Sequence, residues 1–211
     1  VWTDFSTGQG GDLIDLWAAV RKLPLSEALT EVRGWLGVER AKPYREPQKT
    51  YRRPARPVCT APVGIVRDYL TEVRNIPDEI LTRYKIAERG NLIVFPFLLP
   101  SGDLALVKVR KAEDGAKPKP TEADCEPVLF GWQAIPADAR EVCICEGEID
   151  APSLAAYGWP ALSVPFGGGK GAKQQWIENE FERMERFEKI YLALDMDKGG
   201  DEAAEEIANR L

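Results

Sequence analysis

The spacing of apolar residues changes several times along the chain, and each change predicts a different kind of element. Residues 11–37 carry apolar positions at helical spacing on both sides of Pro24, which predicts two short helices. Helical spacing returns in residues 65–81. The next stretch, residues 91–110, alternates like a hairpin around the turn sequence Ser-Gly-Asp. These last two stretches predict a small α+β lobe.

The pattern becomes regular after residue 140. Strand-like runs ("EVCICE", "ALSVP", "KIYLALDMD") alternate with helix-like stretches ("DAPSLAAYG", "AKQQWIENEFERMERF", "DEAAEEIANRL"). Strands that alternate with helices predict a parallel sheet flanked by helices on both faces. The predicted fold class is therefore α/β, with the small α+β lobe and an N-terminal helical segment ahead of the regular sheet.

A basic, proline-rich stretch separates the N-terminal helices from the lobe. Residues 39–58 hold seven basic residues, two acidic residues and four prolines. Such a segment cannot bury a core, so it is predicted to be an extended linker. The predicted organisation is thus a helical segment (1–38), the linker, a basic lobe (59–140) and the regular α/β domain (141–211).

Length and composition narrow the class of protein. With 211 residues and 44% hydrophobic content, the chain can bury one ordinary core or two small lobes. It has no run of about 18 apolar residues and no secretory signal, so we expect a cytoplasmic protein without membrane contact. It starts without Met and stops inside a helical pattern, which we interpret as a fragment of a longer protein.

Missing residue types exclude several kinds of chemistry. The sequence contains no histidine, so imidazole bases, His-bearing zinc sites and serine-type triads are excluded within it. The four cysteines show no C-x-x-C spacing, so zinc is not expected. Cys143 and Cys145 alternate along a predicted strand and are expected to be buried on one face. The net charge is -6, with the acids concentrated after residue 140.

Acidic residues follow two strands of the predicted sheet. Glu146 ends one strand, with Asp150 four residues later, and Asp195 and Asp197 end another. The carboxyl ends of parallel strands meet at one edge, so these carboxylates are expected to converge despite their separation in sequence. Their mutual repulsion requires a compensating partner, and hard oxygen ligands suit Mg²⁺ or Mn²⁺.

A simpler explanation exists for each acidic motif alone. Acids often terminate strands and cap helices, and Asp150 and Asp201 are N-cap candidates. For a lone D-x-D that explanation would be preferred. The combination of E-G-x-x-D at one strand end with D-x-D-x-x-G at a later one is a much rarer coincidence.

These motifs resemble a known family. "CEGEIDAPSLAAYG" together with "LALDMDKGGDEAA" resembles the TOPRIM domain shared by primases, topoisomerases and some nucleases. Ahead of it, "VRDYLTEVRNIPDEILTRYKI", "IVFPFLLPSGDLALVKVR" and "PVLFGWQAIP" resemble the basic half of the RNA-polymerase domain in DnaG-type primases, especially phage-type primase-helicases. "FSTGQGGDLIDLW" resembles the segment that follows the zinc ribbon in phage and plasmid primases. The zinc ligands themselves are absent from the sequence.

The resemblance implies a function. It implies Mg²⁺-dependent synthesis of short RNA primers from ribonucleoside triphosphates on single-stranded DNA, with a replicative helicase, fused or separate, as partner. Carried over to this sequence, Asp195 and Asp197 would hold the metal. Glu146 would be a ligand or a proton acceptor, and Asp150 a ligand or a residue that caps or orients. The family has a further acidic residue one strand later, which lies beyond this sequence.

Cations for the triphosphate are expected from the basic lobe. Lys108 and Arg110 lie on the predicted strand "LVKVR". Lys117 and Lys119, in the loop that follows, correspond by position to the nucleotide-binding lysines of the family. For any single lysine, a solvated charged loop is an equally good explanation.

The stretch "PFGGGKGAKQQ" does not match the P-loop template. Its glycines could still present backbone amides to a phosphate at the start of a helix, with help from Lys170 and Lys173. Alternatively, the glycines only provide a tight turn. The sequence does not favour one interpretation over the other.

Among functions, we favour the primase core. A TOPRIM nuclease would share the carboxylates and Mg²⁺ but would cut nucleic acid, and a non-catalytic domain would only dock DNA or a helicase. A dehalogenase-like phosphatase places its D-x-D on the first strand, whereas here it comes last. The basic linker is interpreted as a tether, and the six scattered tryptophans do not indicate a base-stacking platform.

Overall fold

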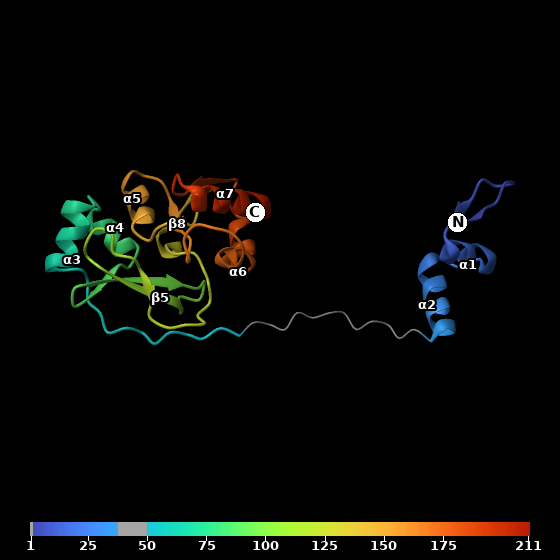
Figure 1. Ribbon diagram of the computed structural model, residues 1–211, viewed down its shortest axis with the longest axis horizontal. Helices are drawn as coiled ribbons and strands as arrows, with labels where there is room; N and C mark the ends of the chain where they lie inside the picture. Colours follow the sequence, from blue (N-terminus) through green and yellow to red (C-terminus); the bar gives the residue numbers. More distant parts are fainter. Residues whose placement is uncertain (1, 38–49) are drawn as a thin grey trace. The chain divides into compact units, whose positions relative to one another are not determined.

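The computed structural model describes residues 2–37 and 50–211 (Figure 1). The chain divides into two compact units at the Lys49–Thr50 boundary, and each is considered by itself. The first part of the predicted linker, residues 39–49, lies outside the described residues. No helix in the described ranges is long and apolar enough to cross a bilayer.

The N-terminal unit is small and confirms the two predicted helices. It consists of a pair of two-residue antiparallel strands and two helices: β1 (Trp2–Thr3), β2 (Gly10–Gly11), α1 (Leu13–Arg21) and α2 (Leu25–Leu36). Helix α1 begins at a capping box, in which Asp12 and Asp15 each accept a hydrogen bond from the other's backbone amide. The two helices are joined by a hydrogen bond from the Trp17 indole to Glu31, 3.0 Å long.

The second unit starts with a helical and antiparallel lobe. Its elements are α3 (Gly64–Asp68), the π-helical turn η1 (Tyr69–Val73), α4 (Asp78–Arg83), β3 (Ala87–Arg89), β4 (Leu92–Leu98), β5 (Leu104–Lys111) and β6 (Lys119–Pro120). The four strands form an antiparallel sheet in the order β3-β4-β5-β6. The predicted hairpin is therefore confirmed as β4 and β5.

The rest of the second unit is one 3₁₀ turn followed by the predicted α/β domain. Its elements are η2 (Trp132–Ala134), β7 (Glu141–Cys145), α5 (Asp150–Ala156), β8 (Ala161–Ser163), η3 (Gly171–Gln174), α6 (Trp176–Met184), β9 (Lys189–Ala193) and α7 (Lys198–Arg210). The three strands are parallel in the order β8-β7-β9. The parallel sheet is thus confirmed. The long predicted helix differs at its start, because residues 171–174 form a 3₁₀ turn before α6 begins.

Alternation along β7 divides the core of the second unit into two clusters. Cys143 and Cys145 face a cluster that runs into the antiparallel lobe, whereas Val142 and Ile144 face a second cluster under α6 and α7. Both cysteines are buried and free, as the sequence predicted. Because the first cluster contains residues of both lobes, the lobes share one core and pack as a single body.

Tyr84 joins the two lobes at the centre of that shared core. Its hydroxyl donates a 2.7 Å hydrogen bond to the backbone oxygen of Ala161, at the start of β8. Gly131 lies under the ring with φ of 107°, where an added Cβ would be 2.7 Å from Cε1 of Tyr84. The glycine of "FGW" is therefore required by this close approach as well as by its backbone conformation.

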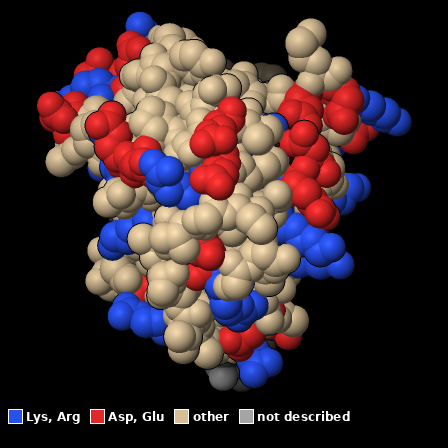
Figure 2. Space-filling view, turned by 90° about the vertical axis from the view of Figure 1, so that its left-hand side faces the viewer, with Lys and Arg blue, Asp and Glu red and all other residues tan. Residues whose placement is uncertain are grey.

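The end of the predicted linker is fixed to the core. Residues 50–58 contain no helix, but the Arg52 amide donates to the Asp124 oxygen and the Ala55 amide donates to Glu122. Arg53 also forms an ion pair with Glu126, 2.6 Å long. The described part of this basic stretch therefore lies along the loop at residues 122–126. Figure 2 shows both charge signs interspersed on one face, without an uninterrupted basic patch.

Helix α6 carries a buried carboxylate near its middle. Glu180 is fully buried and accepts a 3.1 Å hydrogen bond from Arg183. The Arg183 guanidinium in turn lies 3.9 Å from the centroid of the Trp132 ring. Burial raises the pKa of Glu180 from 4.5 to about 7, and the charge of Arg183 only partly opposes this increase.

We expect Glu180 to make stability depend on pH. Its pKa is higher in the folded than in the unfolded state, so its contribution is fully present below about pH 4.5 and is lost as pH rises through about 7. The free energy of unfolding should therefore fall by about 1 to 3 kcal/mol more in wild type than in Glu180→Gln between pH 5 and 8. Urea unfolding at several pH values measures this difference. Glu182→Gln, an exposed neighbour, is the control, and equal pH slopes in wild type and Glu180→Gln would contradict the expectation.

Candidate active site

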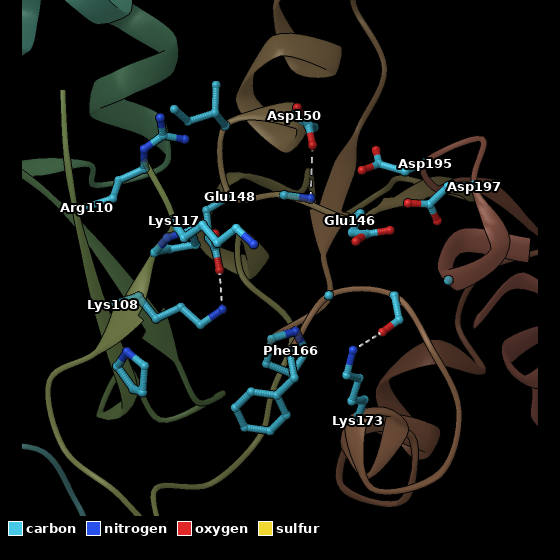
Figure 3. Close-up of a pocket in the computed structure, with 18 of the residues that line it drawn as sticks. Lys108, Arg110, Lys117, Glu146, Glu148, Asp150, Phe166, Lys173, Asp195 and Asp197 are labelled. Atoms are coloured by element: carbon cyan, nitrogen blue, oxygen red, sulfur yellow. Dashed lines mark hydrogen bonds and ion pairs between the residues drawn. The ribbon is translucent and has the colours of Figure 1, made fainter. Parts of the chain in front are cut away.

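A cavity of about 680 Å³ lies between the antiparallel lobe and the carboxyl edge of the parallel sheet (Figure 3). Its charged lining comes from both lobes. The acidic members are Glu146, Glu148, Asp150, Asp195 and Asp197. The basic members are Arg74, Lys108, Arg110, Lys117 and Lys173.

The strand register brings the predicted carboxylates together. Cys145 of β7 pairs with Ala193 of the adjacent parallel strand β9, so the residues that follow emerge at the same edge. Figure 3 shows Glu146, Asp195 and Asp197 grouped at one end of the cavity. The pairing of two distant acidic motifs therefore follows from the order of strands in this sheet.

Glu146 has a buried oxygen with no hydrogen-bond partner in the described residues. This atom, Oε2, lies beneath the glycine-rich loop, and an added Cβ on Gly168 would be 2.9 Å from it. A buried carboxylate oxygen without a donor is costly, and a bound cation would remove that cost. The geometry around Glu146 is thus suited to a metal.

Asp197 and Asp150 each also have a local structural role. Asp197 is the N-cap of α7 and accepts a 2.8 Å hydrogen bond from the Gly200 amide. Asp150 accepts from the Gly147 amide at 3.0 Å, which closes the turn after β7. Neither Asp150 nor Asp201, the two N-cap candidates from the sequence, occupies an N-cap position, because Ile149 and Asp197 do.

The pKa of Asp150 is raised by its place in the cavity wall. Desolvation is the main cause, opposed by the Gly147 amide, and the negative charges of Asp195 and Glu146 add to the increase. Arg74, 4.0 Å from Asp150, opposes it in turn. The carboxylates therefore interact electrostatically, as expected for acids that share one small space.

The carboxylates do not form a closed metal cage. Within the described ranges, no three Asp, Glu or Cys side chains come close enough to enclose an ion by themselves. Mg²⁺ in enzymes usually binds through one or two carboxylates and completes its shell with water and substrate phosphates. Glu146, Asp195 and Asp197 offer only the hard oxygen ligands that this ion prefers, so the donor set fits.

Lys108 and Glu148 form a buried ion pair across the two lobes. Lys108 is 5% exposed and Glu148 3% exposed, and the ammonium lies 2.5 Å from Oε1. Burial raises the pKa of Glu148, and the charge of Lys108 opposes that increase. The sequence analysis included Lys108 but missed Glu148, although the alternation E-G-E placed a second acid in the motif.

Of the other predicted cations, Arg110 and Lys117 line the cavity, and Lys119 and Lys170 do not. Arg110 donates to the Tyr69 hydroxyl at 3.2 Å and to the Glu113 backbone oxygen at 2.8 Å, which anchors the following loop. Lys117 on that loop lines the cavity. Lys119 and Lys170 are not among the cavity residues, and Lys170 pairs with Glu205 at 2.7 Å.

Arg74 lines the cavity and was missed by the sequence analysis. It follows the π-helical turn η1, whose wider hydrogen bond runs from the Arg74 amide to the Tyr69 oxygen. π-helical turns occur often at functional sites. The sequence predicted an ordinary helix here, so it did not indicate which side chains would face the cavity.

The glycine-rich loop is held by side chains that follow it. Gln174 is fully buried and donates to the oxygens of Gly167 and Gly169, while Lys173 donates to the oxygen of Gly168. The Gly169 amide is bound to the Gly199 oxygen at 2.7 Å. A 3₁₀ turn follows instead of an α-helix, so the structure supports the tight-turn interpretation.

Comparison with known proteins agrees with this geometry. The family described as Toprim-like matches residues 143–211. The gene 57 protein of Mycobacterium phage D29 is 30% identical over 108 residues, which are 51% of this chain and 67% of that protein.

Two solved structures are also similar. The primase fragment of the bacteriophage T7 primase-helicase protein is 26% identical, with a TM-score of 0.54 over 66% of this chain and 59% of that chain. A T7 complex of lagging-strand DNA polymerase and primase domains, with an RNA/DNA hybrid and dTTP, matches at 26% identity and a TM-score of 0.53 over 66% and 72%. This chain therefore spans less than two thirds of the T7 primase fragment.

We expect Gly200 to be essential for the position of the D-x-D segment. An alanine there would place its Cβ 1.9 Å from the backbone oxygen of Asp195, whereas at Gly199 the nearest atom, Oδ1 of Asp197, would be 3.3 Å away. Gly200→Ala should destabilise the second unit by about 2 kcal/mol or more, and Gly199→Ala by clearly less. Urea unfolding of both variants tests this, and equal stability of the two would contradict it.

Proposed function

The chain belongs to the TOPRIM-type primases, and we propose that it synthesises short RNA primers on single-stranded DNA as the polymerase core of a larger replication protein. The observation that carries the proposal is the shared cavity, in which carboxylates of the parallel sheet face cations of the antiparallel lobe. Ribonucleoside triphosphates are the proposed substrates, and a helicase, fused or separate, is the proposed partner. The T7 complex, in which primase domains occur together with an RNA/DNA hybrid, supports nucleic acid as a ligand.

The proposed reaction joins a primer 3′-hydroxyl to the α-phosphate of a nucleotide. The new phosphodiester bond forms as the bond to pyrophosphate breaks, and the hydroxyl proton is released. Glu146, Asp195 and Asp197 would hold Mg²⁺, which when bound supplies positive charge and orients phosphate oxygens.

The cations of the cavity would bind the triphosphate. Lys117 and Lys173 line it, and both carry ammonium groups that match phosphate oxygens. Lys108 is held by Glu148, so its charge would act mainly by offsetting the acidic wall at short range. Glu146, whose Oε2 accepts no hydrogen bond in the described residues, would act as metal ligand or as acceptor of the hydroxyl proton.

Primer extension with an Asp197 variant tests the proposed activity. A supplied dinucleotide primer, a single-stranded template, labelled ribonucleotides and Mg²⁺ avoid any need for a separate recognition module. Asp197→Asn keeps an N-cap residue of equal quality and removes the charge, so extension should fall by about 100-fold or more while the fold is retained. Asp201→Asn, in the exposed first turn of α7, is the matched control.

The alternatives give different results in the same assay. Template cleavage that depends on Asp197 would support a TOPRIM nuclease. Template binding without extension or cleavage would support a non-catalytic domain.

Two neighbouring lysines offer a test of nucleotide binding. Lys117 lines the cavity, whereas Lys119 is exposed on β6 and does not. Loss of one charge-assisted contact to phosphate should raise the KM for the nucleotide about tenfold in Lys117→Ala. Lys119→Ala should leave KM unchanged, and steady-state primer extension measures both. Similar KM values for the two variants would contradict the placement of Lys117.

A further inference from the structure

One aromatic ring stands in the wall of a cavity that ten charged residues line together with glycines, prolines and Ile149. Phe166 is the only aromatic residue among the described residues that line the cavity, and it is 39% exposed. Figure 3 shows the ring between Lys108 and Lys173. A partly exposed aromatic ring in the wall of a charged cavity is available to contact a ligand that enters it.

Packing in the hydrophobic core does not account for this ring. Phe166 belongs to neither hydrophobic cluster of the second unit, although Val164, two residues earlier, is fully buried in one of them. Pro165 is buried as well, so the chain leaves the core at Phe166. The ring therefore contributes little to the core and is directed into the cavity.

The ring is nevertheless held in a defined place. It directly precedes the glycine-rich loop, whose oxygens accept hydrogen bonds from Gln174 and Lys173. A binding group on a fixed segment loses little conformational entropy when a ligand arrives. The Lys108 ammonium lies 5.9 Å from the ring centroid, within the range of a cation–π contact.

We propose that Phe166 is the platform on which the base of the incoming nucleotide stacks. The proposal rests on the proposed function, because it assigns the part of the cavity that metal and phosphate contacts leave unused. A nucleoside triphosphate combines a flat base with a polyanion, and the carboxylates and lysines account only for the second. Stacking accepts any base, since every base has a π-face, which suits an enzyme that reads sequence through pairing with a template.

Binding of ATP and of tripolyphosphate to the full chain distinguishes the two halves of this site. Isothermal titration calorimetry with Mg²⁺ present should show ATP affinity weakened about tenfold in Phe166→Ala and in Phe166→Leu, with Phe166→Trp close to wild type. Tripolyphosphate lacks a base, so its affinity should be the same in all four proteins. Phe181→Ala is the control for removing an exposed ring, because Phe181 is 42% exposed on α6 and lies outside the cavity.

Each contrary result has a distinct meaning. Unchanged ATP affinity in Phe166→Leu would overturn stacking, since leucine is apolar but not aromatic. Equal weakening of ATP and tripolyphosphate would also overturn it, because the ring would then act through the shape of the loop. Wild type that binds no nucleotide would overturn the proposed function as well, whereas ATP binding insensitive to Phe166 overturns only the platform.

Discussion

Repulsion among carboxylates at one edge of a three-stranded sheet is the constraint on which the second unit depends. The order β8-β7-β9 places two acidic motifs side by side at this edge. Four of the five basic residues that line the cavity come from the antiparallel lobe, among them Arg74 near Asp150 and Lys108 bound to Glu148. The lobes must therefore be fixed to each other, and the shared core around Tyr84 provides this.

The Lys108–Glu148 ion pair neutralises charge in the cavity but also occupies the Lys108 ammonium. Buried ion pairs add little net stability, but removal of one partner leaves an uncompensated charge and costs about 3 to 5 kcal/mol. We therefore interpret the pair as a contact that fixes the position of β5 relative to the turn after β7. Because the ammonium is already bound, less of its charge is available to a ligand than the sequence alone suggested.

The sequence predicted the elements in which apolar residues recur at regular spacing. It missed cavity residues whose position depends on how distant parts of the chain pack. The hairpin, the parallel sheet and the burial of Cys143 and Cys145 followed from alternation and from strand–helix order. Arg74 was missed because a π-helical turn has no distinct sequence pattern. Glu148 was missed because only the position of Lys108 in space shows that this acid, and not merely Glu146, faces the cavity.

The two glycine runs bring the loop after β8 into direct contact with the start of α7. Gly168 has no space for a Cβ, with the Gly199 carbonyl carbon 2.8 Å from that position, and the Gly169 amide is bound to the Gly199 oxygen. The backbone after β8 is therefore joined directly to the first turn of α7, which Asp197 caps. The glycines for which the sequence left two interpretations open thus join the loop after Phe166 to the helix that Asp197 caps.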